Sequence, residues 1–235
     1  MTGGDLPANP LSAEEALRWV YEQHERVALV ASFQAESSVL IDLACQIIER
    51  PEVITLDTGR LPEETHELIE EFRARYPIRL RVVQPDAAEV EAMTAKHGTN
   101  LFRQSVDLRL KCCDVRKSRP LERVLSGYDA WITGLRRQQS STRAATQQVA
   151  SDPQHGGITK VAPLVEWTKE QVWEYIREHD VPAHPLYAFG YTSIGCAPCT
   201  RATAPGEAER AGRWWWEVDG VKECGLHWRP SEATA

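Results

Sequence analysis

The sequence predicts an α/β fold built on a parallel sheet with helices on both faces. Short, continuous apolar runs, typical of buried parallel strands, recur at 27–31, 53–56, 80–83 and 130–133. Segments with helical periodicity separate these runs, and such alternation is typical of βαβ units. A chain of 235 residues, 42% of them hydrophobic, is long enough for one such domain with a sizeable core.

Capping signals and amphipathic patterns place the helices between and around these strands. A capping box, Ser12 with Glu15, opens a helix through about His24, and a second, Thr168 with Gln171, opens one to about His179. The remaining helices are predicted from the end of the loop 32–37 to near residue 49, and at 63–75, 87–96 and 115–125. Residues 145–157 show no periodicity and are predicted to form a mobile surface loop.

Composition and charge limit the classes of ligand. The formal net charge of -7 argues against a nucleic-acid interface, which is usually basic, so an anionic ligand must meet a local basic pocket. No apolar run could span a bilayer and no signal-peptide pattern opens the chain, so we expect a cytoplasmic protein without a membrane partner. We expect a loose tail at 1–10, the α/β domain at 11–205 and an irregular C-terminal segment at 206–235. The oligomeric state stays open, a homo-oligomer included.

The loops at the carboxyl ends of the strands are the predicted ligand sites, because ligands of parallel sheets bind there. The loop 32–37 offers backbone N–H groups and the hydroxyls of Ser32 and Ser37 to a phosphate, although it lacks the usual glycines and also fits a plain capped turn. In the next loop, which contains Thr58, Gly59 allows close backbone approach and Arg60 can pair with a phosphate. The alternative there is a simple turn with an exposed arginine.

Four of the six cysteines form the strongest motif. Cys112 and Cys113 are adjacent, and Cys196 and Cys199 form a Cys-x-x-Cys pair. Four thiolates suit zinc or an iron–sulfur cluster, and adjacent cysteines fit the separate corners of a [4Fe–4S] cube better than one tetrahedral ion. Lys111, Arg116, Lys117 and Arg119 surround the adjacent pair and would stabilise an anionic cluster. Cys45 lies in an apolar helical run and is interpreted as a core residue.

Cys224, near the end of the sequence, is the cysteine left over. A thiolate is a strong nucleophile, but it needs an electropositive setting to form at neutral pH. Lys222 and His227 favour such a setting and Glu223 opposes it. The residues alone therefore leave a catalytic cysteine and an exposed structural cysteine both open.

Several ordered stretches carry a resemblance to a known family. They are SFQAES at 32–37, LDTGRLP at 56–62, KCC at 111–113 with Arg116 and Lys117, TGLRRQ at 133–138, GCAPC at 195–199, GRWWWE at 212–217 and ECGLH at 223–227. Together they resemble the assimilatory sulfonucleotide reductases, specifically the bacterial adenylyl-sulfate (APS) reductases. The resemblance runs over nearly the whole chain.

The resemblance implies an adenine-nucleotide alpha-hydrolase-like (PP-loop) fold and one [4Fe–4S] cluster per chain on Cys112, Cys113, Cys196 and Cys199. It implies that Cys224 attacks the sulfur of APS in sulfate assimilation and cysteine biosynthesis, giving AMP and an enzyme S-sulfonate. Thioredoxin or a similar thiol reductant would then release sulfite.

The resemblance also implies a set of substrate-binding residues. Lys117, Arg143, Arg210 and Arg213 match basic positions that contact the sulfate and phosphate in relatives. With the loop residues they complete the predicted substrate-binding set, which is Ser32, Ser37, Thr58, Gly59, Arg60, Lys117, Arg143, Arg210 and Arg213.

Three alternative hypotheses for the function remain. The first is a reductase of the 3'-phosphorylated nucleotide (PAPS), whose members usually lack the cluster cysteines. The second is an ATP-dependent PP-loop sulfur-transfer enzyme, which normally carries a Ser-Gly-Gly-x-Asp-Ser loop where this chain has Phe33, Gln34 and Glu36. The third is a non-enzymatic zinc-binding regulator.

Overall fold

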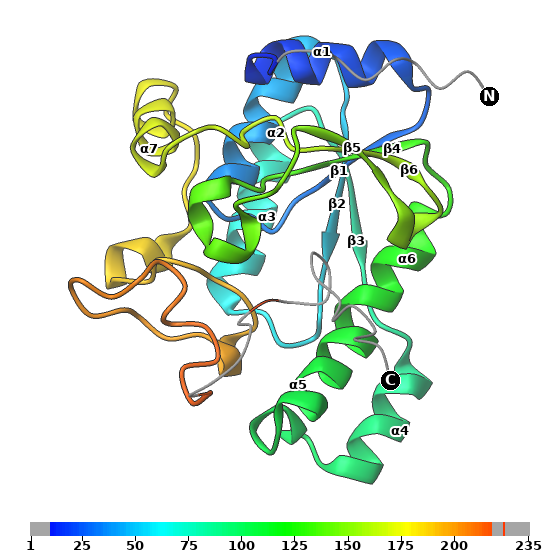
Figure 1. The fold of residues 1–235 in the computed structure, drawn as a ribbon, viewed down its shortest axis with the longest axis vertical. Helices are drawn as coiled ribbons and strands as arrows, with labels where there is room; N and C mark the ends of the chain where they lie inside the picture. Colours follow the sequence, from blue (N-terminus) through cyan, green and yellow to red (C-terminus); the bar gives the residue numbers. More distant parts are fainter. Residues whose placement is uncertain (1–9, 218–222, 224–235) are drawn as a thin grey trace.

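The computed structural model describes residues 10–217 and residue 223, and it shows a six-stranded sheet flanked by helices (Figure 1). The strands are β1 (Val27–Val30), β2 (Glu52–Leu56), β3 (Arg79–Val83), β4 (Ala130–Thr133), β5 (Val149–Asp152) and β6 (Ile158–Val161). The α-helices are α1 (Ala13–Gln23), α2 (Ala35–Ile47), α3 (Glu63–Arg75), α4 (Ala87–His97), α5 (Val106–Cys113), α6 (Arg119–Leu125) and α7 (Lys169–Glu178). In the described part of the chain, no helix combines the length and the apolar character that a membrane span needs.

The sheet has the strand order β3-β2-β1-β4-β6-β5. All neighbouring strands run parallel except β5, which pairs antiparallel with β6 at one edge. The chain leaves β1 toward β2 and β3 on one side and later returns with β4 on the other side. The strand order therefore reverses between β1 and β4, and the crevice at such a switch point is where ligands of open α/β sheets bind.

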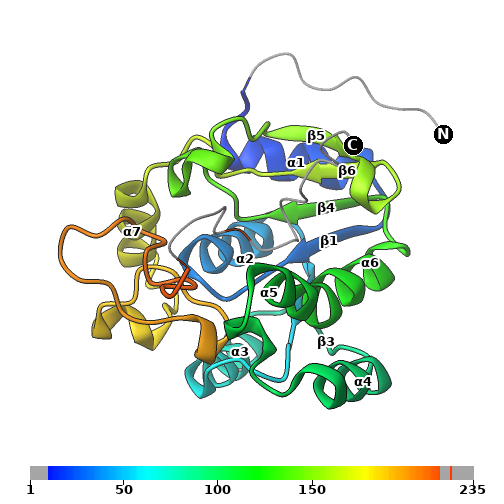
Figure 2. The same ribbon diagram turned by 60° about the horizontal axis from the view of Figure 1, so that its bottom comes forward.

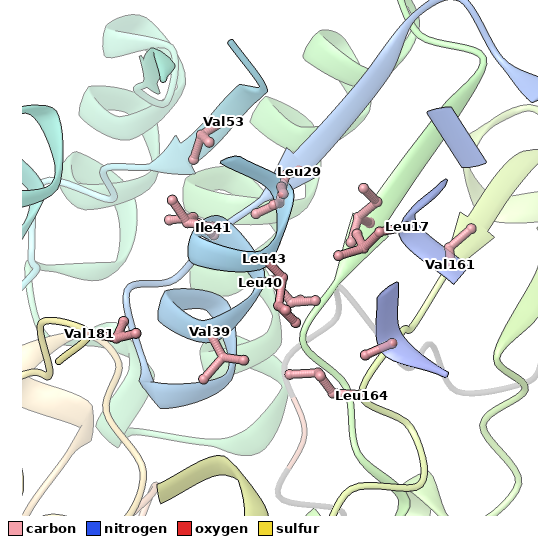
Figure 3. Close-up of a cluster of buried hydrophobic side chains, with 14 of the residues drawn as sticks. Leu17, Leu29, Val39, Leu40, Ile41, Leu43, Val53, Val161, Leu164 and Val181 are labelled. Atoms are coloured by element: carbon pink, nitrogen blue, oxygen red, sulfur yellow. The ribbon is translucent and has the colours of Figure 1, made fainter. Parts of the chain in front are cut away.

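Alternate residues of β1 explain why helices cover both faces of the sheet. Leu29 is buried in a core with α1, α2, α3 and α7, whereas its neighbour Ala28 is buried in a second core with α6. The α2 side chains Val39, Leu40 and Ile41 fill the centre of the first core (Figure 3). Both faces are therefore dry, which matches the continuous apolar runs of the sequence. Helix α6 continues from α5 through residues 114–118, and α4 lies beside this helical run in both ribbon views (Figure 2).

The prediction of a mobile surface loop over 145–157 is wrong. Residues 149–152 form strand β5, and a short 3-10 turn with Gly156 and Gly157 at positive φ leads directly into β6. Asp152 holds this hairpin, because its buried carboxylate accepts from Trp131 Nε1 at 2.9 Å and from the Gln154 amide at 3.2 Å. An edge strand that is only partly buried has no strong apolar pattern, and this explains why the sequence did not reveal it.

Two helix boundaries also differ from prediction. Helix α2 begins at Ala35, inside the predicted loop 32–37, with Gln34 as its N-cap. The single helix predicted at 115–125 is a π-helical segment over Asp114–Ser118 followed by α6, and α5 precedes it from Val106. Because π-helical turns are rare and often mark functional sites, the one directly after Cys113 draws attention to that position.

Candidate functional site

A pocket opens at the switch point between β1 and β4. It is lined by the loop after β1, the loop after β4, the π-helical segment and the irregular chain after α7. The polar and charged residues in its wall include Ser32, Gln34, Glu36, Ser37, Lys117, Gln139, Arg143, Glu209, Arg210 and Arg213. Of the predicted substrate-binding residues, this pocket therefore brings together Ser32, Ser37, Lys117, Arg143, Arg210 and Arg213.

The loop after β1 is held in a tight conformation at the N-terminus of α2. Phe33 has φ 54°, a left-handed conformation that is uncommon for a residue other than glycine, and its ring is fully buried against Phe72. The side chain of Gln34 accepts from the Ile194 amide at 2.7 Å and thereby joins this loop to the chain after α7. A helix N-terminus with fixed backbone amides suits an anionic group.

The loop after β4 approaches α2 closely at Gly134. A Cβ atom there would lie 3.0 Å from Glu36 Cβ and 3.4 Å from the Ser37 amide nitrogen, so a side chain would push the two loops apart. Glu36 is tied to the same loop by a buried ion pair, in which Arg136 Nε lies 2.8 Å from its carboxylate. The two sides of the pocket are therefore fixed relative to each other.

Arg213 reaches the pocket only because residue 195 is a glycine. A Cβ atom on Gly195 would collide with the Arg213 guanidinium, which donates to the Ile194 carbonyl oxygen at 3.2 Å. Arg213 is buried, and it also stacks on the Trp214 ring, with its Cζ 4.7 Å from the ring centroid. A guanidinium held in this way is preorganised to meet an anion.

Thr58, Gly59 and Arg60 lie outside the wall of this pocket and border a second, smaller cavity. Thr58 Oγ1 lies 3.3 Å from Cys196 Sγ, and the carbonyl oxygen of Thr58 accepts from Arg116 Nη1 at 2.7 Å. Arg60 lines the smaller cavity and donates to the Thr99 carbonyl oxygen at 2.6 Å. Gly59 has φ 68°, so a left-handed turn carries the chain past Arg116.

The smaller cavity, called here the cysteine cavity, brings together the four cysteines of the sequence motif. Cys112 and Cys113, at the end of α5, line it together with Cys196 and Cys199 of the Cys-x-x-Cys turn. Among the described residues, no group of three or more His, Cys, Asp or Glu side chains meets the geometry for a single metal ion. A tetrahedral single-ion site is therefore not preformed in the described chain, whereas all four thiols share one cavity wall.

The charge around the cysteine cavity suits an anionic, thiolate-bound group. Burial raises the pKa of Cys199 to about 12, and it also raises the pKa of Cys112, against which the charge of Arg116 acts. Arg60, Arg116 and Lys117 line the same cavity, and the buried Arg116 Nε has no hydrogen-bond partner among the described residues. Thiols of raised pKa ionise when they bind a metal, and an unsatisfied N–H donor suits the sulfur atoms of a cluster. The donor set therefore fits a [4Fe–4S] cluster.

Other cations that were expected around the adjacent cysteines are placed differently. Arg119 lies on the surface and pairs with Glu89 at 2.7 Å and Asp114 at 2.8 Å, and Lys111 is exposed. Lys117 lines both the switch-point pocket and the cysteine cavity. The two cavities therefore share a wall at the π-helical segment.

The structure adds residues that the sequence did not single out. Arg109 of α5 is 1% exposed, pairs with Glu217 at 2.9 Å and has its Cζ 4.6 Å from the centroid of the Trp214 ring. Trp214 is buried in the same apolar cluster as Cys112, Cys113 and Cys199, and Cys196 packs against this cluster. An arginine in an amphipathic helix is usually an exposed residue, so only the contact with Glu217, more than 100 positions away, reveals its burial.

Cys224, the predicted nucleophile, lies outside the described residues, as do Lys222 and His227. Glu223, its neighbour in the sequence, is described and is 2% exposed. Its carboxylate pairs with Arg143 at 2.9 Å and with Arg210 at 3.1 Å, both of which line the switch-point pocket. The residue that precedes Cys224 is therefore fixed beside this pocket.

The fold and the two cavities define an α/β protein with a cation-rich pocket at the switch point of its sheet, next to a group of four cysteines. Residues 26–202 match the sequence model of the phosphoadenosine phosphosulfate reductase domain, and the chain belongs to this family.

Named relatives and solved structures agree with this assignment. The chain is 43% identical to the adenosine 5'-phosphosulfate reductase of Burkholderia cepacia, over 95% of this chain and 89% of that one. It is 44% identical to the enzyme of the same name from Allochromatium vinosum, over 95% and 87%. The phosphoadenylyl-sulfate reductase of Candida auris, solved with phosphate, superposes with a TM-score of 0.70 at 29% identity, covering 81% of this chain and 91% of that one. Yeast FAD synthetase shares the fold alone, with a TM-score of 0.55 at 15% identity, covering 83% of this chain and 60% of that one.

Proposed function

We propose that this protein reduces adenylyl sulfate (APS) to sulfite and AMP in sulfate assimilation, as a step toward cysteine biosynthesis. The observation that carries the proposal is the placement of six predicted anion-binding residues in one pocket at the β1/β4 switch point, next to a cavity lined by four cysteines. Relatives named for APS reduction match at 43–44% identity over 95% of the chain and support APS as the substrate. The Candida auris PAPS reductase matches at 29% identity and represents the alternative substrate.

The proposed chemistry is a two-step thiol exchange that starts at Cys224. The thiolate of Cys224 attacks the sulfur of APS, a cysteine S–S bond to the sulfonate forms, and the bond between sulfur and the phosphate oxygen breaks with its electron pair on AMP. A dithiol, such as thioredoxin, then attacks the sulfur of Cys224 and releases sulfite. The mixed disulfide resolves through the second thiol of the reductant. The dithiol is thereby oxidised by two electrons and Cys224 returns as a thiol.

The residues of the pocket have separate roles in this proposal. Ser32, Ser37 and the N-terminus of α2 receive the phosphate side of APS. Lys117 and Arg213 meet the sulfate and stabilise the negative charge that grows on the departing phosphate oxygen. Thr58, Gly59 and Arg60 act at the border with the cysteine cavity, where Thr58 contacts Cys196. Arg143 and Arg210 complete the cationic rim.

We further propose that Cys112, Cys113, Cys196 and Cys199 hold one [4Fe–4S] cluster per chain. When bound, the cluster supplies a fixed charge and a rigid connection between α5 and the Cys-x-x-Cys turn. Lys117 lines both cavities. In this proposal its ammonium group acts between the substrate and the cluster. A reducing cytoplasmic setting, in which thiolates stay available as cluster ligands, completes the proposal.

Mass spectrometry of the purified protein tests this function directly. Mixed with APS in the absence of a reductant, the protein should gain one sulfonate on the peptide that contains Cys224 and release one equivalent of AMP. Thioredoxin added afterwards should remove the sulfonate as sulfite. An unmodified Cys224 in protein that holds its iron would overturn the mechanism, and faster modification by PAPS than by APS would change the substrate. Zinc without iron would support the regulator reading instead.

A further inference from the structure

The carboxylate of Glu223 is held by an unusually complete set of partners. Arg143 donates from Nε to Oε1 at 3.0 Å and from Nη2 to Oε2 at 2.9 Å, and Arg210 Nη2 donates to Oε2 at 3.1 Å. The hydroxyls of Ser140 and Thr142 each donate to Oε1 at 3.0 Å. Arg143 and Arg210 both line the switch-point pocket, so the carboxylate is anchored at its rim.

The backbone of Glu223 is held from the opposite side. Its carbonyl oxygen accepts from Arg109 Nη1 at 2.7 Å, and the same guanidinium holds Glu217 through Nε at 2.9 Å and Nη2 at 3.0 Å. Arg109 lies on α5, the helix that ends with Cys112 and Cys113. One residue is therefore tied both to the substrate pocket and to the helix that carries two cysteines of the cysteine cavity.

The charges show that these contacts act on an ionised carboxylate. Burial by itself raises the pKa of Glu223, but the hydrogen bond from Arg143 and the charge of Arg210 outweigh it, so its pKa lies below the ordinary value. A buried carboxylate with two guanidiniums is strongly held, and loss of one partner leaves charge uncompensated. Glu223 is 2% exposed, whereas glutamates are almost never fully buried unless they are paired.

We propose that Glu223 is a positioning residue: it docks the chain onto Arg143, Arg210 and Arg109 so that Cys224, the next residue, is presented to the sulfonucleotide in the pocket. This inference rests on the proposed function. Two of the cations that the sequence resemblance assigns to the substrate thus also serve the docking of the nucleophile. In this proposal the same arginines hold the nucleotide and the residue that precedes Cys224.

Because of this arrangement, loss of the Glu223 charge should affect nucleotide affinity and the rate of S-sulfonate formation in opposite directions. The carboxylate neutralises part of the cationic rim, so the isosteric variant Glu223→Gln should bind AMP at least as tightly as the wild type. Cys224 would be held less well, so the variant should form the S-sulfonate about tenfold more slowly or worse in a single turnover. A residue with a merely structural role would weaken binding and chemistry together.

The experiment compares wild type, Glu223→Gln and the control Glu207→Gln, all with the cluster loaded. Glu207 accepts two hydrogen bonds from Arg201, at 2.9 and 2.8 Å, in the same C-terminal region but outside the pocket wall, so its variant also removes an ion-paired carboxylate. Three quantities are measured: AMP affinity, the rate of sulfonate formation on the Cys224 peptide with APS alone, and alkylation of that peptide by iodoacetamide without nucleotide. Only Glu223→Gln should show slower sulfonate formation together with faster alkylation.

The outcomes separate this inference from the proposed function. If the wild type forms no sulfonate, the proposed function fails. If the wild type forms it and Glu223→Gln matches it in both rate and alkylation, the docking role is wrong. Glu223→Asp gives a second test, because it keeps the charge but is too short for all the contacts, and its sulfonate rate should lie between those of wild type and Glu223→Gln. A Glu223→Asp rate below that of Glu223→Gln would also overturn the role.

Discussion

The switch-point pocket and the cysteine cavity are neighbours, but they are built in different ways. The pocket stands on strands and helices of the sheet domain, with β1 and β4 pairing in register from Val27 with Ala130 to Val30 with Thr133. The cysteine cavity depends on the end of α5, a π-helical segment and irregular chain between 190 and 217. The sheet side is thus supported by two dry cores, whereas the other side has a small apolar cluster of its own.

This difference indicates where each site obtains its rigidity. The loops of the pocket follow paired, buried strands, which fix the position of each loop at its start. The irregular chain, as described from 190 to 217, has no α-helix or sheet strand of its own and is held by scattered tertiary contacts, such as the isolated bridge between Thr200 and Arg213 and the tight passage of Gly212 past the Arg201 carbonyl. Chain without the repeated hydrogen bonds of helices and strands opens more readily. We therefore expect the cysteine side to depend on its bound group and the sheet side to be independent of it.

The largest effect is expected from removal of one cysteine ligand. The Cys199→Ser variant should lose nearly all of its iron and its activity, because a hydroxyl is a poor replacement for a thiolate at an iron corner. Hydrogen exchange should then speed up in α5 and around 195–217, while β1, β2 and β4 keep the protection of the wild type. Iron content and exchange rates measured on the same preparation provide the check.

Cys45→Ser is the matched control for this variant. Cys45 is only partly buried, on α2, and burial raises its pKa to about 12, so it is an unreactive thiol away from both cavities. The control should retain full iron and activity. Loss of exchange protection throughout the sheet of Cys199→Ser would contradict the independence of the two regions.

The same division explains how much the sequence could predict. The strands β1 to β4 and most helices follow from apolar runs and capping boxes, since each is specified by residues that are close in the sequence. Ser12 with Glu15 and Thr168 with Gln171 are both observed as reciprocal caps. Strands β5 and β6 were both missed, because their pairing with each other, the pairing of β6 with β4 and the hydrogen bond from Trp131 to Asp152 are tertiary interactions.

The candidate site shows the same limit. Spacing was sufficient to group the four cysteines, because Cys-Cys and Cys-x-x-Cys are local patterns. Nothing local marks Arg109 or the anchoring of Glu223, which join segments 108 and 80 residues apart. Glu223 was interpreted only as an unfavourable charge beside Cys224. Its pairing with Arg143 and Arg210 changes that interpretation, because the two guanidinium groups already compensate the negative charge of Glu223.

A smaller but local effect is expected at the contact between Gly195 and Arg213. The Gly195→Ala variant places a methyl group where the guanidinium lies, so Arg213 must move away from its position in the pocket wall. Displacement of a positioned group by about 1 Å can cost about 100-fold in rate, so kcat/KM for APS should fall by up to about this factor. The cluster should stay bound, which iron analysis would verify.

Gly127→Ala is the control for backbone effects. A Cβ atom there would meet only the Val124 carbonyl oxygen, at an ordinary 3.7 Å, and Gly127 lies outside both cavities. Its kcat/KM should equal that of the wild type. A Gly195→Ala enzyme with unchanged kcat/KM would mean that Arg213 does not need this position.

The smallest effect concerns the joint between the irregular chain and the sheet domain, where His184 is 1% exposed. Its Nδ1 accepts from the Leu186 amide at 3.2 Å, so Nε2 carries the proton and donates to Thr65 Oγ1 at 2.9 Å. Burial lowers the pKa of His184 from 6.5 to about 4. The neutral ring therefore connects α3 to the segment after α7.

The sign of the pH dependence follows from this lowered pKa. Between pH 6.5 and 4, His184 binds a proton in the unfolded chain but not in the folded protein. Its contribution to the free energy of unfolding is therefore fully present above pH 6.5 and is lost as the pH drops toward 4. At about 1.4 kcal/mol per pKa unit, the loss is at most about 3.5 kcal/mol. Urea unfolding of wild type and His184→Asn at several pH values measures it. At pH 7 the variant should have a lower free energy of unfolding than the wild type, but acidification should reduce it less. If the free energies of unfolding of the two proteins fall in parallel with pH, the pKa of His184 is not lowered as its burial requires.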